Sequence, residues 1–162
     1  MIAIVSLALI LFALLSWYKL EYSMDFVMSK EINTPNAPVH ILIATQGSEF
    51  KNNVTEQLIA QLNHDSIYVM VIDVSRLDSI QEGEWNVIVL MHTWENWEPQ
   101  PDAEQFVNRV VDKRKLIVLT TSGAGDNQMD GIDGIASASK LDTSDQTAGQ
   151  IITRIKEILK YH

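Results

Sequence analysis

The alternation of two patterns after Pro38 constrains the fold more than any other feature of the chain. Short apolar runs rich in β-formers alternate with amphipathic stretches, which is typical of a parallel sheet with crossover helices. Because the runs are continuously apolar, we expect helices to cover both faces of the sheet. The expected strands are residues 39–45, 67–73, 85–91 and 115–121, with a short edge strand within 134–139.

Three amphipathic stretches with helical periodicity connect or follow these strands. The first has Ser48 as a candidate N-cap, the second begins at Pro101, and the last has Ser144 among its candidate caps. Residues 76–81 allow one or two further helical turns. Right-handed crossovers between these elements predict an open, doubly wound sheet with the strand order 2-1-3-4-5.

An apolar stretch precedes this α/β pattern. Residues 2–18 are 17 residues without a charge, and a helix of that length would reach about 26 Å, close to the ~30 Å hydrocarbon layer of a bilayer. No basic segment precedes it and no small-x-small site follows it, which argues against a cleaved signal peptide. We therefore expect a single transmembrane anchor over residues 1–19, a tether over 20–38, and a globular domain over 39–162.

The charges limit the partners and the side of the membrane. Lys19 and Lys30 follow the apolar stretch, so the positive-inside rule favours a cytoplasmic globular domain. A net charge of −9 with only 12 Lys and Arg argues against nucleic-acid binding, because phosphates need clustered basic residues. The chain has no cysteine, which excludes thiolate catalysis and a cysteine-ligated metal site.

In a doubly wound sheet, ligands lie outside the carboxyl ends of the strands. Three loops are expected to converge there, formed by residues 45–51, 92–99 and 121–130. The second loop reads HTWENWEP and holds two tryptophans three residues apart. Such rings either cover a local patch of core or offer a flat surface for stacking.

These loops resemble those of the flavodoxins, and the resemblance covers nearly all of residues 39–161. In that family the third strand ends in a Thr-Trp pair whose indole stacks on the flavin, and Thr93 and Trp94 stand in that place. The family's Gly-x-Gly-Asp loop along the flavin edge is matched by residues 123–126. Residues 131–135 look like the family's approach to its last strand.

The first loop departs from the family pattern. Flavodoxins hold the FMN phosphate with a [ST]-x-T-G-x-T loop, whose hydroxyls and helix N-terminal amides donate to the phosphate oxygens. Residues 45–51 here keep fewer hydroxyls, and Glu49 adds a negative charge that Lys51 would partly offset. No aromatic residue follows Asp126 as an outer stacking ring, so Trp97 would have to replace it.

Two functions remain open. If FMN binds, the resemblance implies a membrane-tethered electron carrier. If it does not, the loops form a degenerate pocket, and the tryptophans form a contact patch for a protein partner in a membrane complex. No catalytic triad and no metal site are expected. The candidate FMN-binding residues are Thr45, Gln46, Gly47, Ser48, Lys51, Thr93, Trp94, Trp97, Gly123, Gly125 and Asp126.

Overall fold

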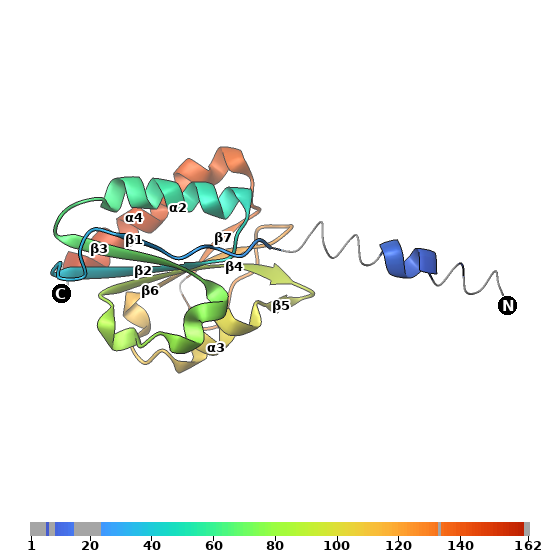
Figure 1. The fold of residues 1–162 in the computed structure, drawn as a ribbon, viewed down its shortest axis with the longest axis horizontal. Coiled ribbons are helices and arrows are strands. Elements are labelled where there is room, and N and C mark those ends of the chain that lie inside the picture. The colour runs from blue at the N-terminus through green and yellow to red at the C-terminus, as the bar shows by residue number, and fades with distance from the viewer. Residues whose placement is uncertain (1–5, 7–8, 15–23, 133, 161–162) are drawn as a thin grey trace.

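A central sheet with helices on both faces forms the globular part of the protein (Figure 1). The structure is a computed structural model that describes residues 6, 9–14, 24–132 and 134–160 of the 162-residue chain. The strands are β1 (Lys30–Ile32), β2 (Val39–Thr45), β3 (Ile67–Asp73), β4 (Val87–Glu95), β5 (Glu98–Pro99), β6 (Leu116–Thr121) and β7 (Ile135–Ser137). The α-helices are α2 (Glu49–Leu62), α3 (Pro101–Arg109) and α4 (Ser144–Lys160), and the 3-10 helices are η1 (Val74–Ser79), η2 (Glu82–Glu84), η3 (Lys113–Lys115) and η4 (Leu141–Thr143).

The full sheet differs from the sequence prediction by an added edge strand. The sheet runs β1-β3-β2-β4-β6-β7, and β5 pairs with β4 outside this path. The strands from β3 to β7 along this path are parallel, whereas β1 is antiparallel to β3. The five predicted strands are β2, β3, β4, β6 and β7, and among themselves they lie in the order 2-1-3-4-5. The predicted fold class, a flavodoxin-like sheet of that order behind a transmembrane helix, is nevertheless wrong as a whole, because the full sheet has antiparallel β1 at its edge and no helix among the described residues can span a membrane.

The extra strand β1 lies in the stretch that was expected to be a tether. It turns back onto the sheet at Asn33, which has a positive φ of 65° and whose side-chain amide donates to the carbonyls of His64 (3.0 Å) and Ile67 (2.8 Å). By pairing with β3 it covers an edge that would otherwise expose unpaired backbone groups. Three residues are too few for a periodic signal, so the pairing with β3 decides that they form a strand.

The predicted membrane span is also corrected. Among the described residues, no helix is long and apolar enough to cross a bilayer. Within the apolar stretch, residues 6 and 9–14 are described and are helical. The finding contradicts the predicted single-pass membrane localisation, and residues 1–5, 7–8 and 15–23 of the predicted anchor and tether lie outside the described part.

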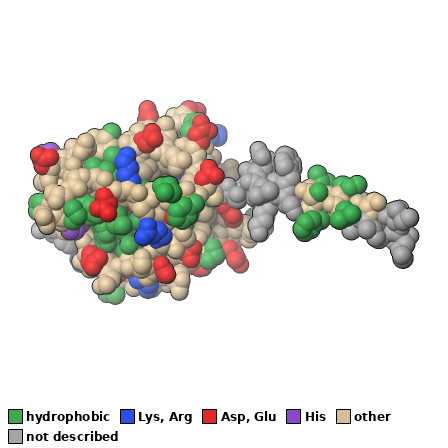
Figure 2. All heavy atoms as spheres, viewed as in Figure 1, with side chains coloured by type: hydrophobic (Ala, Val, Ile, Leu, Met, Phe, Trp, Pro, Cys, Tyr) green, Lys and Arg blue, Asp and Glu red, His purple; other side chains and the backbone are tan. Residues whose placement is uncertain are grey.

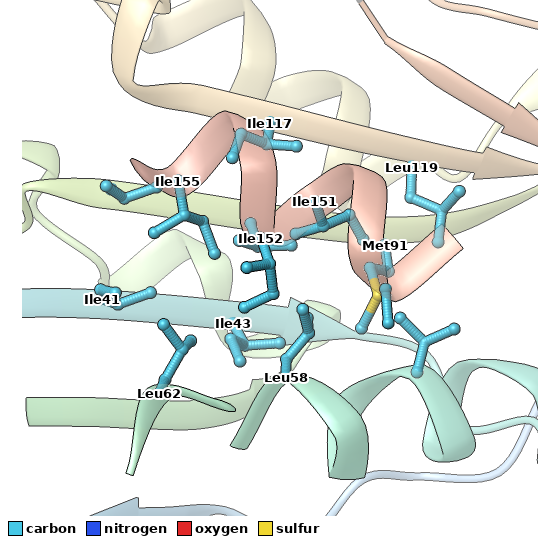
Figure 3. Close-up of a cluster of buried hydrophobic side chains, with 14 of the residues drawn as sticks. Ile41, Ile43, Leu58, Leu62, Met91, Ile117, Leu119, Ile151, Ile152 and Ile155 are labelled. Carbon is cyan, nitrogen blue, oxygen red and sulfur yellow. The ribbon is translucent and has the colours of Figure 1, made fainter. Parts of the chain in front are cut away.

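Each face of the sheet has its own buried cluster, as alternating strand side chains require. On one face Ile41 and Ile43 of β2 pack with side chains of α2 and α4 (Figure 3). On the other face Leu42 and Ala44 of the same strand join the cluster beneath α3. The helices are positioned by local caps as well as by these contacts, and the predicted N-cap Ser48 is confirmed, since its Oγ accepts from the backbone N–H of Lys51.

Candidate functional site

Three threonines lie at or near the ends of neighbouring strands, at the carboxyl edge of the sheet. Thr45 of β2 is in register with Met91 of β4, and Thr93 of β4 is in register with Thr121 of β6. The predicted residues of the first two loops thus meet at one place. Gln46 ties these loops together, because its Oε1 accepts from the backbone N–H of Thr93 at 2.6 Å.

A buried lysine lies at the centre of this edge. Lys51 belongs to the first turn of α2, and its side chain is 1% exposed. Its Nζ donates to Thr93 Oγ1 at 2.7 Å and to Thr121 Oγ1 at 3.4 Å, and Met24 Sδ lies at 3.7 Å. Among the described residues no carboxylate is within ion-pair distance of this ammonium. Threonine hydroxyls, rather than a carboxylate counter-ion, therefore stabilise the charged ammonium.

This environment perturbs the titration of the lysine. Burial lowers the pKa of Lys51 from 10.5 to about 8, and the more distant carboxylate of Glu95 acts in the opposite direction. Desolvation disfavours the charged form of a buried amine. At neutral pH the group is still an ammonium, and it fills the space between the first helical turn and the ends of β4 and β6.

Residues 24–27, which we call the strap, cover the first loop. Gly47 N donates to Asp25 O at 2.8 Å, and Asp25 N donates to Gly47 O at 3.0 Å. Farther along, Val27 N donates to Asp73 Oδ2 at 2.9 Å. A Cβ on residue 47 would lie 2.3 Å from Asp25 O, so glycine is required for the strap to approach this closely.

The first loop already uses several of its hydrogen-bond donors within the chain. The N–H of Gly47 is bonded to the strap, and the N–H of Lys51 is bonded to Ser48 Oγ at 3.2 Å. The hydroxyl of Thr45 donates to Gln46 O at 3.1 Å. These are three of the donors that an FMN phosphate could use, and the chain itself already uses them. FMN binding stays a prediction.

The sequence HTWENWEP forms a β-hairpin and not a polar loop. β4 extends to Glu95 and pairs with β5, with Trp94 opposite Pro99. The two turn residues Asn96 and Trp97 have φ values of 51° and 69°, as a type I′ turn requires. The hairpin projects beyond the carboxyl edge of the sheet (Figure 1).

The two tryptophans of the hairpin differ in their surroundings. Trp94 is partly buried against the cluster beneath α3, and its ring centroid lies 6.5 Å from that of His92. Trp97 is 94% exposed. Trp94 therefore covers core, as one of the two sequence interpretations expected, whereas Trp97 contributes little to packing.

His92 is a buried residue of the fold. It is 0% exposed, and its Nε2 is 3.0 Å from Thr120 Oγ1. Burial lowers its pKa to about 4, and the charge of Lys51 acts in the same direction. The ring is neutral at physiological pH, so it does not act as a general acid near pH 7.

The third loop lies apart from the lysine. Gly123 and Asp126 are exposed, and Gly125 has a φ of 76° with its N–H donating to Ser122 Oγ at 2.9 Å. A Cβ at Gly125 would lie 2.6 Å from Ala138 N, so this glycine fits against the end of β7. Among the described contacts, none joins these three predicted residues to Lys51.

A cavity of about 320 Å³ opens beneath the hairpin on the α3 side. Trp94 and Pro99 contribute to it from the hairpin, Val107 from α3, and Met129 from the segment after β6. The lining also includes the carboxylates of Glu104 and Asp130, and it contains no basic residue.

Sequence reasoning missed the strap and the threonine that completes the lysine site. Met24 and Asp25 lie in the expected tether, where no periodic pattern points to a contact with residues 47 and 51. Thr121 could have been found, because it ends a predicted strand beside Thr93. No known family model matches the chain, and no curated protein matches it, so the likeness to flavodoxins rests on the quoted motifs alone.

Proposed function

We propose that this protein is a binding module that docks a protein partner through the β4–β5 hairpin, and that it works without FMN. The observation that carries the proposal is the state of Trp97, a large aromatic residue that is 94% exposed and has a left-handed backbone. A non-glycine residue in that conformation costs about 1–3 kcal/mol and persists where function requires it. Folding gains little from the ring in return.

The residues that flank the turn add a second unfavourable feature. Glu95 and Glu98 are directly opposite each other in the β4–β5 ladder, and like charges in such a pair are destabilising. A type I′ turn is best served by Asn-Gly, whereas this chain has Asn96 followed by Trp97. Residues that disfavour the local backbone conformation or pairing in which they lie are typical of functional sites.

Aromatic residues of this kind dominate the energy of protein interfaces. Tryptophan is enriched among hot-spot residues, because one side chain buries a large area with little loss of rotamer freedom. A projecting hairpin tip can also enter a concave surface without rearrangement of the sheet. The flavin alternative lacks comparable support, since Asp25 O of the strap and Ser48 Oγ already accept from the N–H groups of Gly47 and Lys51 in the first loop.

The experiment compares three full-length versions of the protein. A partner is isolated with the tagged wild type from its own cells, identified by mass spectrometry and purified. Its dissociation constant is then measured with the wild type, with Trp97→Gly and with Val111→Ala. Val111 is the matched control, because it is an apolar residue that is 89% exposed beyond the far end of α3.

We expect Trp97→Gly to weaken binding at least about tenfold, which is about 1.4 kcal/mol, and Val111→Ala to leave it unchanged. Glycine completes the Asn-Gly pair that the turn prefers, so a loss of binding cannot be attributed to a loss of folding. A partner that binds Trp97→Gly as tightly as wild type would contradict the proposal. So would the lack of any protein that binds the purified chain below about 100 μM.

A further inference from the structure

The cavity beneath the hairpin combines an aromatic wall with polar side chains and unpaired carboxylates. Trp94 supplies an aromatic wall, with Val107 and Met129 beside it. At the rim, Glu104 and Asp130 are exposed, and among the described residues neither side chain forms a hydrogen bond or an ion pair. A group that enters the cavity thus meets an aromatic ring and two negative charges.

The size of the cavity suits one long side chain. Its volume of about 320 Å³ is at the lower limit of the ~300–1,000 Å³ range of small-molecule pockets. The cavity adjoins the docking hairpin directly, since Trp94 and Pro99 are the ladder pair next to Glu95 and Glu98. A partner that covers Trp97 would therefore bring its neighbouring residues to the cavity mouth.

The charge around the cavity favours a cation. Glu95 and Glu98 lie one position further along the two strands than Trp94 and Pro99, so their side chains are on the opposite face of the hairpin. They add to the negative field without lining the cavity. The chain carries a net charge of −9, and acidic side chains are spread over the face of the molecule in Figure 2.

Arginine matches these features better than lysine does. A guanidinium is planar, stacks on an indole face, and donates in a fork that fits carboxylates. It is also less strongly hydrated than an ammonium, which favours its contact with the indole of Trp94. We infer that the cavity binds an arginine side chain from a segment of the partner protein; this inference rests on the proposed docking function.

The test uses the full-length ¹⁵N-labelled protein with a methyl-labelled Met, and a defined probe. The probe is an acetylated and amidated heptapeptide, Gly-Ser-Gly-Arg-Gly-Ser-Gly, and its control carries citrulline in place of arginine. Citrulline keeps the shape of the side chain and removes the charge. The readouts are the indole N–H of Trp94 and the methyl group of Met129, with the buried indole of Trp85 as the internal reference.

Two double variants distinguish binding in the cavity from attraction of the peptide by the negative charge of the molecule as a whole. The cavity variant is Glu104→Gln with Asp130→Asn, and the matched control is Glu95→Gln with Glu98→Gln. Both remove two carboxylates from the same end of the molecule. We expect the arginine peptide to shift Trp94 and Met129 but not Trp85. We expect citrulline and the cavity variant each to weaken this binding at least about tenfold, and the hairpin variant less than about threefold.

Three results would overturn the inference: equal shifts with the citrulline peptide, an equal loss in both double variants, or no shift of Trp94 up to about 10 mM peptide. The two proposals can fail separately. If Trp97→Gly abolishes partner binding while the arginine peptide does not bind, docking stands and the arginine inference fails. If the peptide binds while Trp97→Gly leaves partner binding unchanged, docking through the hairpin fails and arginine binding in the cavity stands.

Discussion

Replacement of the buried lysine by an isosteric apolar residue should stabilise the protein at neutral pH. Lys51 is 1% exposed, and the described residues place no counter-ion beside its ammonium. Burial lowers its pKa from 10.5 to about 8, which corresponds to a penalty of about 3 kcal/mol on the charged form at pH 7. Lys51→Met removes this penalty at similar side-chain volume.

The two hydroxyls that Lys51 contacts would not be left without partners. Thr93 Oγ1 and Thr121 Oγ1 are 3.1 Å apart, and Thr121 Oγ1 also donates to His92 O at 3.2 Å. Some hydrogen-bond energy is still lost with the ammonium, about 1–2 kcal/mol. We therefore expect Lys51→Met to raise the free energy of unfolding by about 1–2 kcal/mol at pH 7.

The pH dependence gives a sharper test than the stability at one pH. The folded protein binds the proton of Lys51 less tightly than the unfolded chain does, so the penalty is fully present below pH 8 and disappears as the pH rises towards 10.5. Wild type should thus gain about 2 kcal/mol relative to Lys51→Met between pH 7 and about pH 9.5. This range stays below the ionisation of Tyr68, whose pKa is raised by burial.

The assay is urea unfolding followed by circular dichroism at both pH values. Lys113→Met is the matched control, because Lys113 is exposed in η3 and its replacement should change stability by less than about 0.5 kcal/mol. A difference between wild type and Lys51→Met that is the same at both pH values would refute the reasoning. A loss of more than about 2 kcal/mol at pH 7 would show that the ammonium stabilises the fold.

Two further predictions concern the strap and the flavin. Gly47→Ala places a methyl group against Asp25 O and should lower the free energy of unfolding by about 2 kcal/mol through loss of the two bridging hydrogen bonds; Gly149→Ala in α4, where a Cβ meets nothing within 4 Å, should instead be neutral or stabilising by up to about 1 kcal/mol. Equal effects of the two changes would contradict the packing of the strap. Full-length protein that is incubated with excess FMN and then freed of unbound ligand should show no flavin absorption in the visible range, and retained bands would support the electron-transfer prediction instead.

The main strands and helices could be predicted because their signals are local. The apolar runs at residues 39–45 and 67–73 became β2 and β3 with the predicted bounds, and Ser48 caps α2. Each of these elements has the composition and length that its secondary structure favours on its own. Their faces follow from strand alternation, which places Ile41 and Leu42 in different clusters.

The elements that sequence reasoning missed depend on long-range contacts. β1 is short and polar and forms because β3 offers a free edge. The turn at Asn96 and Trp97 carries no Asn-Gly signal, so the hairpin that it closes was expected to be a loop. Hydropathy indicated a transmembrane helix, whereas no helix among the described residues can span a membrane.

The candidate site could be predicted only in part from the sequence, for the same reason. The convergence of the first two loops follows from strand register, and Gln46 and Thr93 do meet. The role of Lys51 could not be read from its position in the sequence, because its partners Met24, Thr93 and Thr121 are distant along the chain. The sequence showed that the first loop has fewer hydroxyls than a flavodoxin phosphate loop, but it did not show that the strap covers this loop.

The free energy of unfolding of Trp97→Gly tests the central claim most directly, since it requires no knowledge of the partner. If Trp97 is held in a left-handed conformation for binding, glycine relieves that strain and removes a ring that is 94% exposed. We predict a gain of about 1 kcal/mol in urea unfolding, with an unchanged dependence on denaturant. A loss of about 1 kcal/mol or more would show that the indole stabilises the fold and would contradict a docking role.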